Sequence, residues 1–201
     1  MRLDFPSPEA LAAAAVALSC DVAAIRAVAR VEAGPNGAFL QELPGEPPTV
    51  LFERHVFHRL TGGRFHDCHA EGLPASCSLL SSPEPGGYGP VRLQHQRLAA
   101  ARTLDDGAAV SATSWGLYQL MGENHRRAGC RSLAEFEASM RRSVDDHLQL
   151  FVAFIHADAR LQLAIQRYDW RTFARIYNGP AFEQHGYHTR LAAAFREELA
   201  A

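Results

Sequence analysis

Glu32 is a residue of this sequence whose type and position suit acid catalysis. With Ile25, Val28 and Ala29 it falls on one face of an expected helix, by i, i+3, i+4, i+7 spacing. This face is apolar except for its last member, which stands just before the break Gly-Pro-Asn-Gly at 34–37. A carboxyl group at the end of a buried stripe is partly desolvated, so we expect its pKa to be raised. Such a group can donate a proton near neutral pH, whereas the alternative is an ordinary exposed glutamate at a helix end.

Two further segments combine aromatic, amide and small side chains in a way that suits a sugar ligand. The first is SWGLYQLMG at 114–122, where we expect a helix to start, and the second is YNGP at 177–180, with Tyr187 after a short turn. A sugar ring with N-acetyl groups needs a flat apolar surface and directed hydrogen bonds. Core aromatics and a Gly-Pro helix stop would explain the same residues structurally. The predicted substrate-binding residues are Ser114, Trp115, Gln119, Tyr177, Asn178 and Tyr187.

The order of these motifs resembles the goose-type lysozyme and lytic transglycosylase superfamily. It is most similar to one branch, the phage endolysin N-acetylmuramidase family, first described as a domain of unknown function. The resemblance spans about residues 8–198 and implies a mainly α, lysozyme-like fold with a small β or loop excursion after the catalytic helix. It also implies hydrolysis of the MurNAc-β-1,4-GlcNAc bond of peptidoglycan. The stretches that carry it are AIRAVARVEAG (24–34), VLFERHVFHRLTG (50–62), SATSWGLYQLMGENHRRAGC (111–130) and FARIYNGP with Tyr187 (173–187).

The resemblance also implies roles for individual residues. Glu32 falls on the catalytic glutamate that ends the family's V-E-S/A-G helix motif, and the Ser-x-Gly-Leu-x-Gln segment would line the floor of the cleft. Tyr177 and Asn178 would flank the scissile sugar, with Tyr187 nearby. The sequence departs from the family after Glu32 and in a longer loop at 64–87. Relatives often carry a separate wall-binding module, whereas we expect residues 1–201 to form a single catalytic domain without one.

A second carboxylate is expected at Glu53, which directly follows the short apolar run at 49–52. It would activate water from the opposite face of the sugar or act as a nucleophile. The alternative is a structural ion pair with Arg54 or another arginine. If no second carboxylate lies within reach, the substrate's own 6-hydroxyl would attack, and the enzyme would be a lytic transglycosylase. No route needs a metal or organic cofactor, and the other acids left open are Asp67, Glu71, Glu84 and Glu123.

The stretch at 55–77 contains several side chains able to bind zinc. No paired CxxC or HExxH spacing occurs in it, so we predict a polar loop with scattered histidines and no metal site. A competing hypothesis is a helical interaction protein with a structural zinc ion bound by His66, Cys68, His69 and Cys77. A disulfide between Cys68 and Cys77 would also fit oxidising conditions, although the spacing does not establish one.

The apolar periodicity predicts a mainly helical chain. We expect helices at 8–19 and 21–33, a short strand at 49–52, and a short helix at 55–60, followed by a loop-rich segment rich in Gly, Pro and Ser at 61–90. The later helices are expected at 91–103, 105–111, 116–128, 132–139, 143–157, 159–167, 170–177 and 187–200.

The amino-acid composition excludes some classes of binding partner. The chain has 201 residues and 47% hydrophobic content, which suit one globular domain. Its 20 basic residues, all arginine, face 22 acidic ones, so we expect no nucleic-acid partner. The apolar run at 11–20 follows the acids Asp4 and Glu9, which favours a helix over an export signal, and no run approaches the roughly 20 residues of a membrane span.

Glycan strands of peptidoglycan are therefore the expected partner. We expect synthesis in the cytoplasm without a signal peptide, and action in the periplasm after release by a phage holin or delivery by a secretion system. Delivery into rival cells would add an immunity protein as a second partner. A peptidoglycan-binding module without catalysis is the remaining alternative, and the position of Glu32 argues against it.

Overall fold

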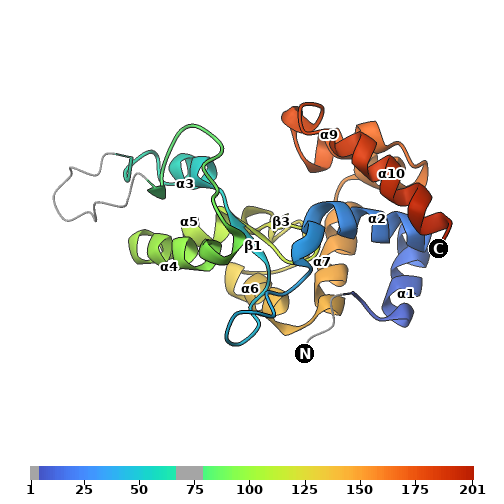
Figure 1. Cartoon of the computed structure of the whole chain (residues 1–201), viewed down its shortest axis with the longest axis horizontal. Coiled ribbons are helices and arrows are strands. Elements are labelled where there is room, and N and C mark those ends of the chain that lie inside the picture. Colours follow the sequence, from blue (N-terminus) through green and yellow to red (C-terminus); the bar gives the residue numbers. More distant parts are fainter. Residues whose placement is uncertain (1–4, 67–78) are drawn as a thin grey trace.

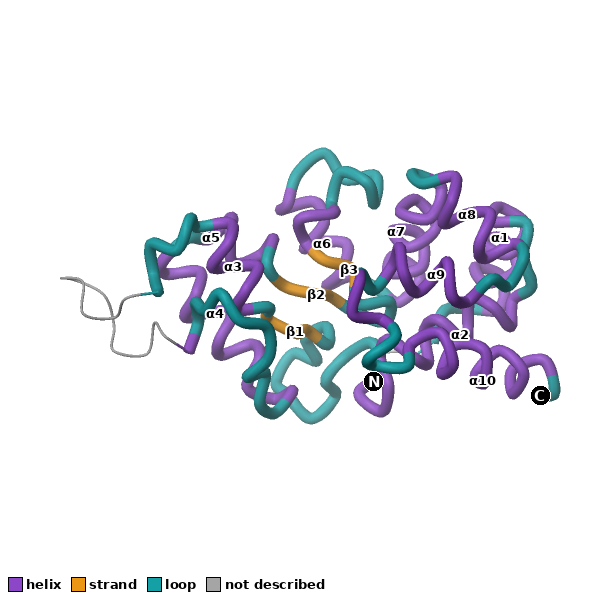
Figure 2. Tube along the Cα trace, turned by 90° about the horizontal axis from the view of Figure 1, so that it is seen from above, coloured by secondary structure: helices purple, strands orange, loops and turns teal. Residues whose placement is uncertain are grey.

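The structure is a computed structural model, and it describes residues 5–66 and 79–201. Figures 1 and 2 show a small sheet with helices α3, α4 and α5 on one side and a larger helical lobe on the other. One set of buried apolar side chains runs through both parts, from Ile25 in the helical lobe to Phe52 and Trp115 in the sheet. The mainly α fold with a small β excursion that the sequence predicts is confirmed.

The helical lobe is built around two helices that pack on each other, α2 and α10 (Figure 1). Short polar residues cap its helices: Ser7 accepts a hydrogen bond from Ala10 N at 3.2 Å, and Asp21 accepts one from Ala23 N at 2.9 Å. These caps confirm the helix starts that the sequence predicts. The helices of this lobe are α1 (Pro8–Leu18), α2 (Val22–Ala33), α7 (Val144–His156), α8 (Ala159–Gln166), α9 (Trp170–Tyr177) and α10 (Tyr187–Leu199).

The smaller lobe contains an antiparallel sheet of order β1-β2-β3. Val50 pairs with Trp115 and Phe52 with Thr113, so β1 is joined to a strand far along the chain. The strands are β1 (Val50–Phe52), β2 (Thr113–Trp115) and β3 (Leu120–Met121), and the helices around them are α3 (Arg54–Leu60), α4 (Gln94–Leu104), α5 (Asp106–Ser111) and α6 (Leu133–Arg142).

The predicted helix at 116–128 is wrong, because this segment begins as the turn of the β2–β3 hairpin and continues into a 3-10 turn, η4 (Gly122–Asn124). Gly116 and Gln119 have φ angles of 67° and 46°, in the left-handed region that a right-handed helix cannot use. The ring of His147 in α7 holds this turn, since Leu117 N donates to its Nδ1 at 3.2 Å. A contact with a distant helix therefore decides the local conformation.

In the described part of the chain, no single helix has the length and hydropathy of a membrane span. Two pairs of consecutive helices, each pair joined at a sharp bend, reach the length and composition of a span only when taken together. They are α1 with the segment 22–36 and α7 with α8.

Candidate active site

Glu32 lies in the last turn of α2, where Gly34 ends the helix. The Asn178 side chain at the end of α9 reaches it, and its Nδ2 donates to Glu32 Oε1 at 2.8 Å. Burial raises the pKa of the Glu32 carboxyl to about 7, and the Asn178 hydrogen bond and the charge of Arg190 oppose this shift only in part. Glu32 is therefore protonated below neutral pH, as the sequence predicts.

Tyr177 and Tyr187 approach the same carboxyl from α9 and α10. The Tyr177 hydroxyl donates to the carbonyl of Tyr118 at 2.6 Å and so ties α9 to the hairpin turn. Burial and then the charge of Glu32 raise the pKa of Tyr177 well above its ordinary value. Burial raises the pKa of Tyr187 as well, and the charges of both Glu32 and Glu53 add to that shift. Tyr187 thus lies close enough to both predicted catalytic carboxylates to be affected by their charges.

Glu53 follows β1 and immediately precedes α3, so the sheet fixes its backbone: its N–H donates to the carbonyl of Ala112 at 2.9 Å. Burial raises the pKa of its carboxyl, although a hydrogen bond from Tyr88 and the nearby His55 act in the opposite direction. Its Oε2 lies 3.3 Å from His55 Nδ1 but accepts no hydrogen bond from the described residues. The expected alternative pair with Arg54 does not form, because Arg54 Nε donates to Gly86 O at 3.1 Å.

The predicted substrate-binding residues divide into two groups. Tyr177, Asn178 and Tyr187 gather around Glu32. Ser114 and Trp115 lie in the interior of the hairpin, where Ser114 Oγ donates to Met121 Sδ at 3.0 Å and Trp115 is completely buried. These contacts give both residues a structural part in the fold, and their binding of substrate stays a prediction.

Gln119 occupies the hairpin turn between the two groups. Its side-chain Nε2 donates to the carbonyl of Gly116 at 2.8 Å, which closes the turn, and the residue is half-buried. Because this hydrogen bond uses only one of the two amide hydrogens, the other amide hydrogen and the oxygen remain able to meet a ligand.

Two residues of the site, Tyr88 and Arg190, are not among those predicted from the sequence. Tyr88 lies in the Gly- and Pro-rich stretch, where no spacing signal connects it to Glu53. Arg190 lies three residues after Tyr187 on α10, its guanidinium is 5.2 Å from the centre of the Tyr187 ring, and this i, i+3 relation was readable from the sequence. Its side chain also donates to Val31 O at 3.0 Å, which connects α10 to the end of α2.

The described members of the other predicted acids lie away from Glu32 and Glu53 or are engaged by other partners. Glu123 forms an ion pair with Arg59 at 2.8 Å, and Glu84 is exposed in a loop. Within the described ranges, no group of three or more His, Cys, Asp or Glu side chains is arranged to bind a metal. The remaining candidates, Asp67, Cys68, His69, Glu71 and Cys77, lie outside the described residues.

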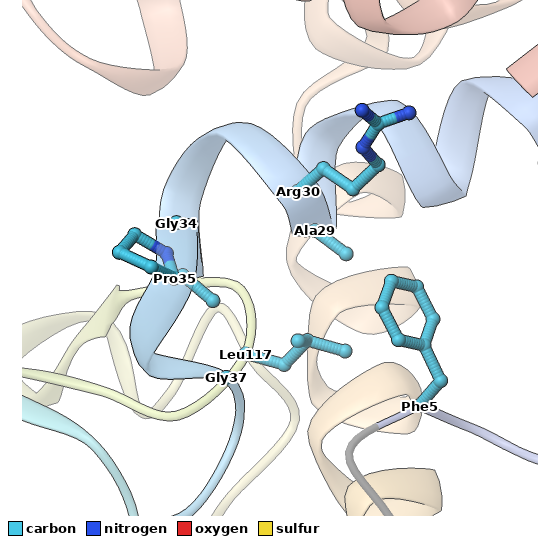
Figure 3. Close-up of a pocket in the computed structure, with 8 residues that line it drawn as sticks. Phe5, Ala29, Arg30, Gly34, Pro35, Gly37 and Leu117 are labelled. Carbon is cyan, nitrogen blue, oxygen red and sulfur yellow. The ribbon is translucent and has the colours of Figure 1, made fainter. Parts of the chain in front are cut away.

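A cavity of about 360 Å³ opens beside the C-terminal end of α2 (Figure 3). Ala29, Pro35 and Leu117 line it with apolar atoms, and Phe5 stands at its edge. Arg30 also lines the cavity, whereas Glu32 is not among its lining residues.

The Asn178 hydrogen bond makes a testable contribution to the pH dependence of activity. It favours the ionised form of Glu32, so replacing Asn178 by leucine is expected to raise the pKa of that carboxyl further. The basic limb of the kcat/KM profile would then move from near neutral to higher pH by about one unit. Asn124→Leu, in η4, is the matched control and should leave the limb in place. An unmoved limb in Asn178→Leu would show that Glu32 does not set it.

Comparison with known proteins identifies the family of the chain. A family model described as N-acetylmuramidase matches residues 21–198. The crystal structure of the Burkholderia AP3 phage endolysin superposes with a TM-score of 0.79 at 32% sequence identity, covering 100% of this chain and 74% of that one. No curated protein matches the sequence. Together the family model and the shared fold show that the chain belongs to the N-acetylmuramidase family of lysozyme-type peptidoglycan hydrolases.

Proposed function

We propose that this enzyme cleaves the MurNAc-β-1,4-GlcNAc bond with Glu32 as its general acid. The observation that carries the proposal is the desolvated Glu32 carboxyl, whose pKa of about 7 keeps it protonated at mildly acidic and neutral pH. A general acid works best when its pKa lies near the working pH. The position of Glu32 at the end of α2, beside Asn178 and Tyr187, supports the same role.

The hydrogen bond from Asn178 also indicates which oxygen carries the proton. Because Asn178 Nδ2 donates to Oε1, that oxygen is an acceptor and the proton resides on Oε2. Oε2 then protonates the glycosidic oxygen as the C–O bond breaks and positive charge develops at the anomeric carbon of the muramic acid. The leaving GlcNAc departs with the proton on its 4-oxygen, and Glu32 becomes ionised.

Glu53 supplies the second carboxylate of the proposed mechanism. Its Oε2 is buried and accepts no hydrogen bond from the described residues, so it is an acceptor that a water molecule brought into the site would satisfy. The water oxygen forms a bond to the anomeric carbon while Glu53 takes its proton, which completes a hydrolysis with one proton donated and one removed. This division of labour needs Glu53 ionised and Glu32 protonated, so activity should fall at low pH as Glu53 takes up a proton and at high pH as Glu32 loses its own.

Mass spectrometry of purified peptidoglycan after digestion tests the reaction. The wild-type enzyme should release fragments with reducing-end MurNAc, and Glu32→Gln should release none over the same time. Ends of 1,6-anhydro-MurNAc would instead show a lytic transglycosylase and remove Glu53 from the mechanism. If the wild-type protein bound accessible walls but cleaved none of them, a binding module would replace the enzyme.

The lysis of a phage host is the setting that we propose. The endolysin that shares this fold over the whole chain is a phage protein, which favours release to the cell wall by a holin over delivery into rival cells. Expression in the cytoplasm with a holin should lyse the host, whereas expression without one should not. Delivery by a secretion system would instead predict a neighbouring immunity protein that binds the enzyme and blocks its cleavage of peptidoglycan.

A further inference from the structure

Three successive backbone carbonyls at 86–88 are each held by a different side chain. Arg54 Nε donates to the first at 3.1 Å, an Arg97 guanidinium nitrogen donates to the second at 2.7 Å, and Gln94 Nε2 donates to the third. Carbonyls in a surface segment are ordinarily satisfied by water. We call residues 86–88 the strap, because side chains from α3 and α4 fix it at every residue.

Gln94 connects the strap to the sheet beneath it. Its side chain is fully buried, and while its Nε2 donates to Tyr88 O, its Oε1 accepts a hydrogen bond from Phe52 N at 3.1 Å. Phe52 is the last residue of β1 and directly precedes Glu53. One buried amide therefore fixes the backbone of Tyr88 and the backbone beside Glu53 relative to each other.

The strap directs the Tyr88 side chain toward the second carboxylate. Burial and the charge of Glu53 raise the pKa of Tyr88 to about 12, and Tyr88 in turn opposes the raised pKa of Glu53, so the two side chains lie next to each other. Gly87 has a φ of 67°, in the region that favours glycine, and a Cβ there would lie 2.9 Å from the Arg54 guanidinium and displace it.

We propose that Tyr88 is a positioning residue for Glu53, and that the buried Gln94 fixes the backbones of these two residues relative to each other. The inference rests on the proposed function of Glu53 and adds to it a device that orients the carboxylate toward the bound water. A hydrogen bond to one carboxylate oxygen fixes the rotation of the whole group, so the other oxygen faces a constant direction. The same hydrogen bond favours the ionised form, which is the form that takes a proton from water.

Tyr88→Phe tests the proposal, because it removes only the hydroxyl. We expect kcat to fall about tenfold with KM within about twofold, and the acidic limb of the pH profile to move to higher pH by about one unit. The Glu53 carboxyl followed by 13C NMR, in Glu32→Gln protein with and without Tyr88→Phe, should show the same upward shift in pKa without any need for activity. Tyr168→Phe, an exposed tyrosine that stacks on Phe195, is the matched control and should change neither quantity.

Gln94→Met provides a second test, with the exposed Gln96→Met in the same helix as its control. The buried variant should lower kcat by at least as much as Tyr88→Phe, and the control should not. An unchanged NMR titration of Glu53 in the Tyr88→Phe pair would overturn the proposal, as would a raised KM with unchanged kcat, which would place Tyr88 in contact with substrate instead. Full activity of Glu53→Gln would contradict the proposed function of Glu53 separately, since the titration still reports whether Tyr88 acts on that carboxyl.

Discussion

Glu32→Gln is expected to lower kcat about 10³-fold while leaving the affinity for glycan strands nearly unchanged. The substitution keeps the size of the side chain and its ability to accept the Asn178 hydrogen bond, but it removes the proton that the leaving oxygen needs. General acid catalysis contributes about 10²–10⁴-fold to rates of this kind, and glycoside hydrolysis depends on it strongly because an alkoxide is a poor leaving group. Release of reducing ends from purified peptidoglycan measures the rate, and sedimentation with insoluble walls measures binding.

The same variant is expected to be more stable than the wild type in alkaline solution. The folded-state pKa of Glu32 is raised from 4.5 to about 7, so the folded protein binds this proton more tightly than the unfolded chain does. The contribution of the Glu32 carboxyl to the free energy of unfolding is fully present below about pH 4.5 and is lost as the pH rises through 7. At about pH 8, Glu32→Gln should therefore raise the free energy of unfolding by about 2–3 kcal/mol, with little change near pH 4.5.

Urea unfolding at the two pH values measures this difference. Glu42→Gln, which removes an exposed carboxyl, is the control and should alter stability little at either pH. A loss of activity accompanied by equal instability at both pH values would mean that glutamine disrupts the fold. Retention of wild-type activity would remove Glu32 from catalysis altogether.

Gly122→Ala is expected to destabilise the protein by about 3 kcal/mol or more. A Cβ at this position would lie 2.1 Å from the carbonyl oxygen of Val110 and 3.1 Å from Ser111 Cα. Both obstructing atoms belong to the backbone at the end of α5, so no side-chain rotation relieves the clash, and overpacking of this kind costs several kcal/mol. The close approach joins α5 to η4, which in turn packs against strand β2 of the hairpin.

Gly107→Ala in α5 provides a control whose effect on stability should have the opposite sign. Its added Cβ would meet only Asp105 Oδ1, at 3.9 Å, and its backbone is helical and exposed. Alanine there is expected to raise the free energy of unfolding by about 0.4–1 kcal/mol, because it reduces the freedom of the unfolded chain. Thermal and urea unfolding of the two variants should move in opposite directions, and equal behaviour would show that the contact at Gly122 relaxes easily.

Most of the helices and the position of Glu32 beside the core could be predicted from the order of the residues alone. Helix ends followed from local chemistry, as in the Asp21 cap and the Gly34 break on either side of α2, because the groups that satisfy a helix end lie within a few residues of it. The apolar spacing of Ile25, Val28 and Ala29 likewise placed Glu32 beside the core, and its raised pKa followed from that burial.

The hairpin and the surroundings of Glu53 depend instead on contacts between distant parts of the chain. The segment after Trp115 has helical propensity, yet His147 from α7 binds the turn at Leu117 and the chain forms a strand pair instead. Tyr88 and Gln94 reach Glu53 and its neighbour across more than thirty residues of sequence. Contacts of this kind follow no sequence period, since they depend on which side chains the fold brings together, and only the assembled structure could therefore show how the second carboxylate is held.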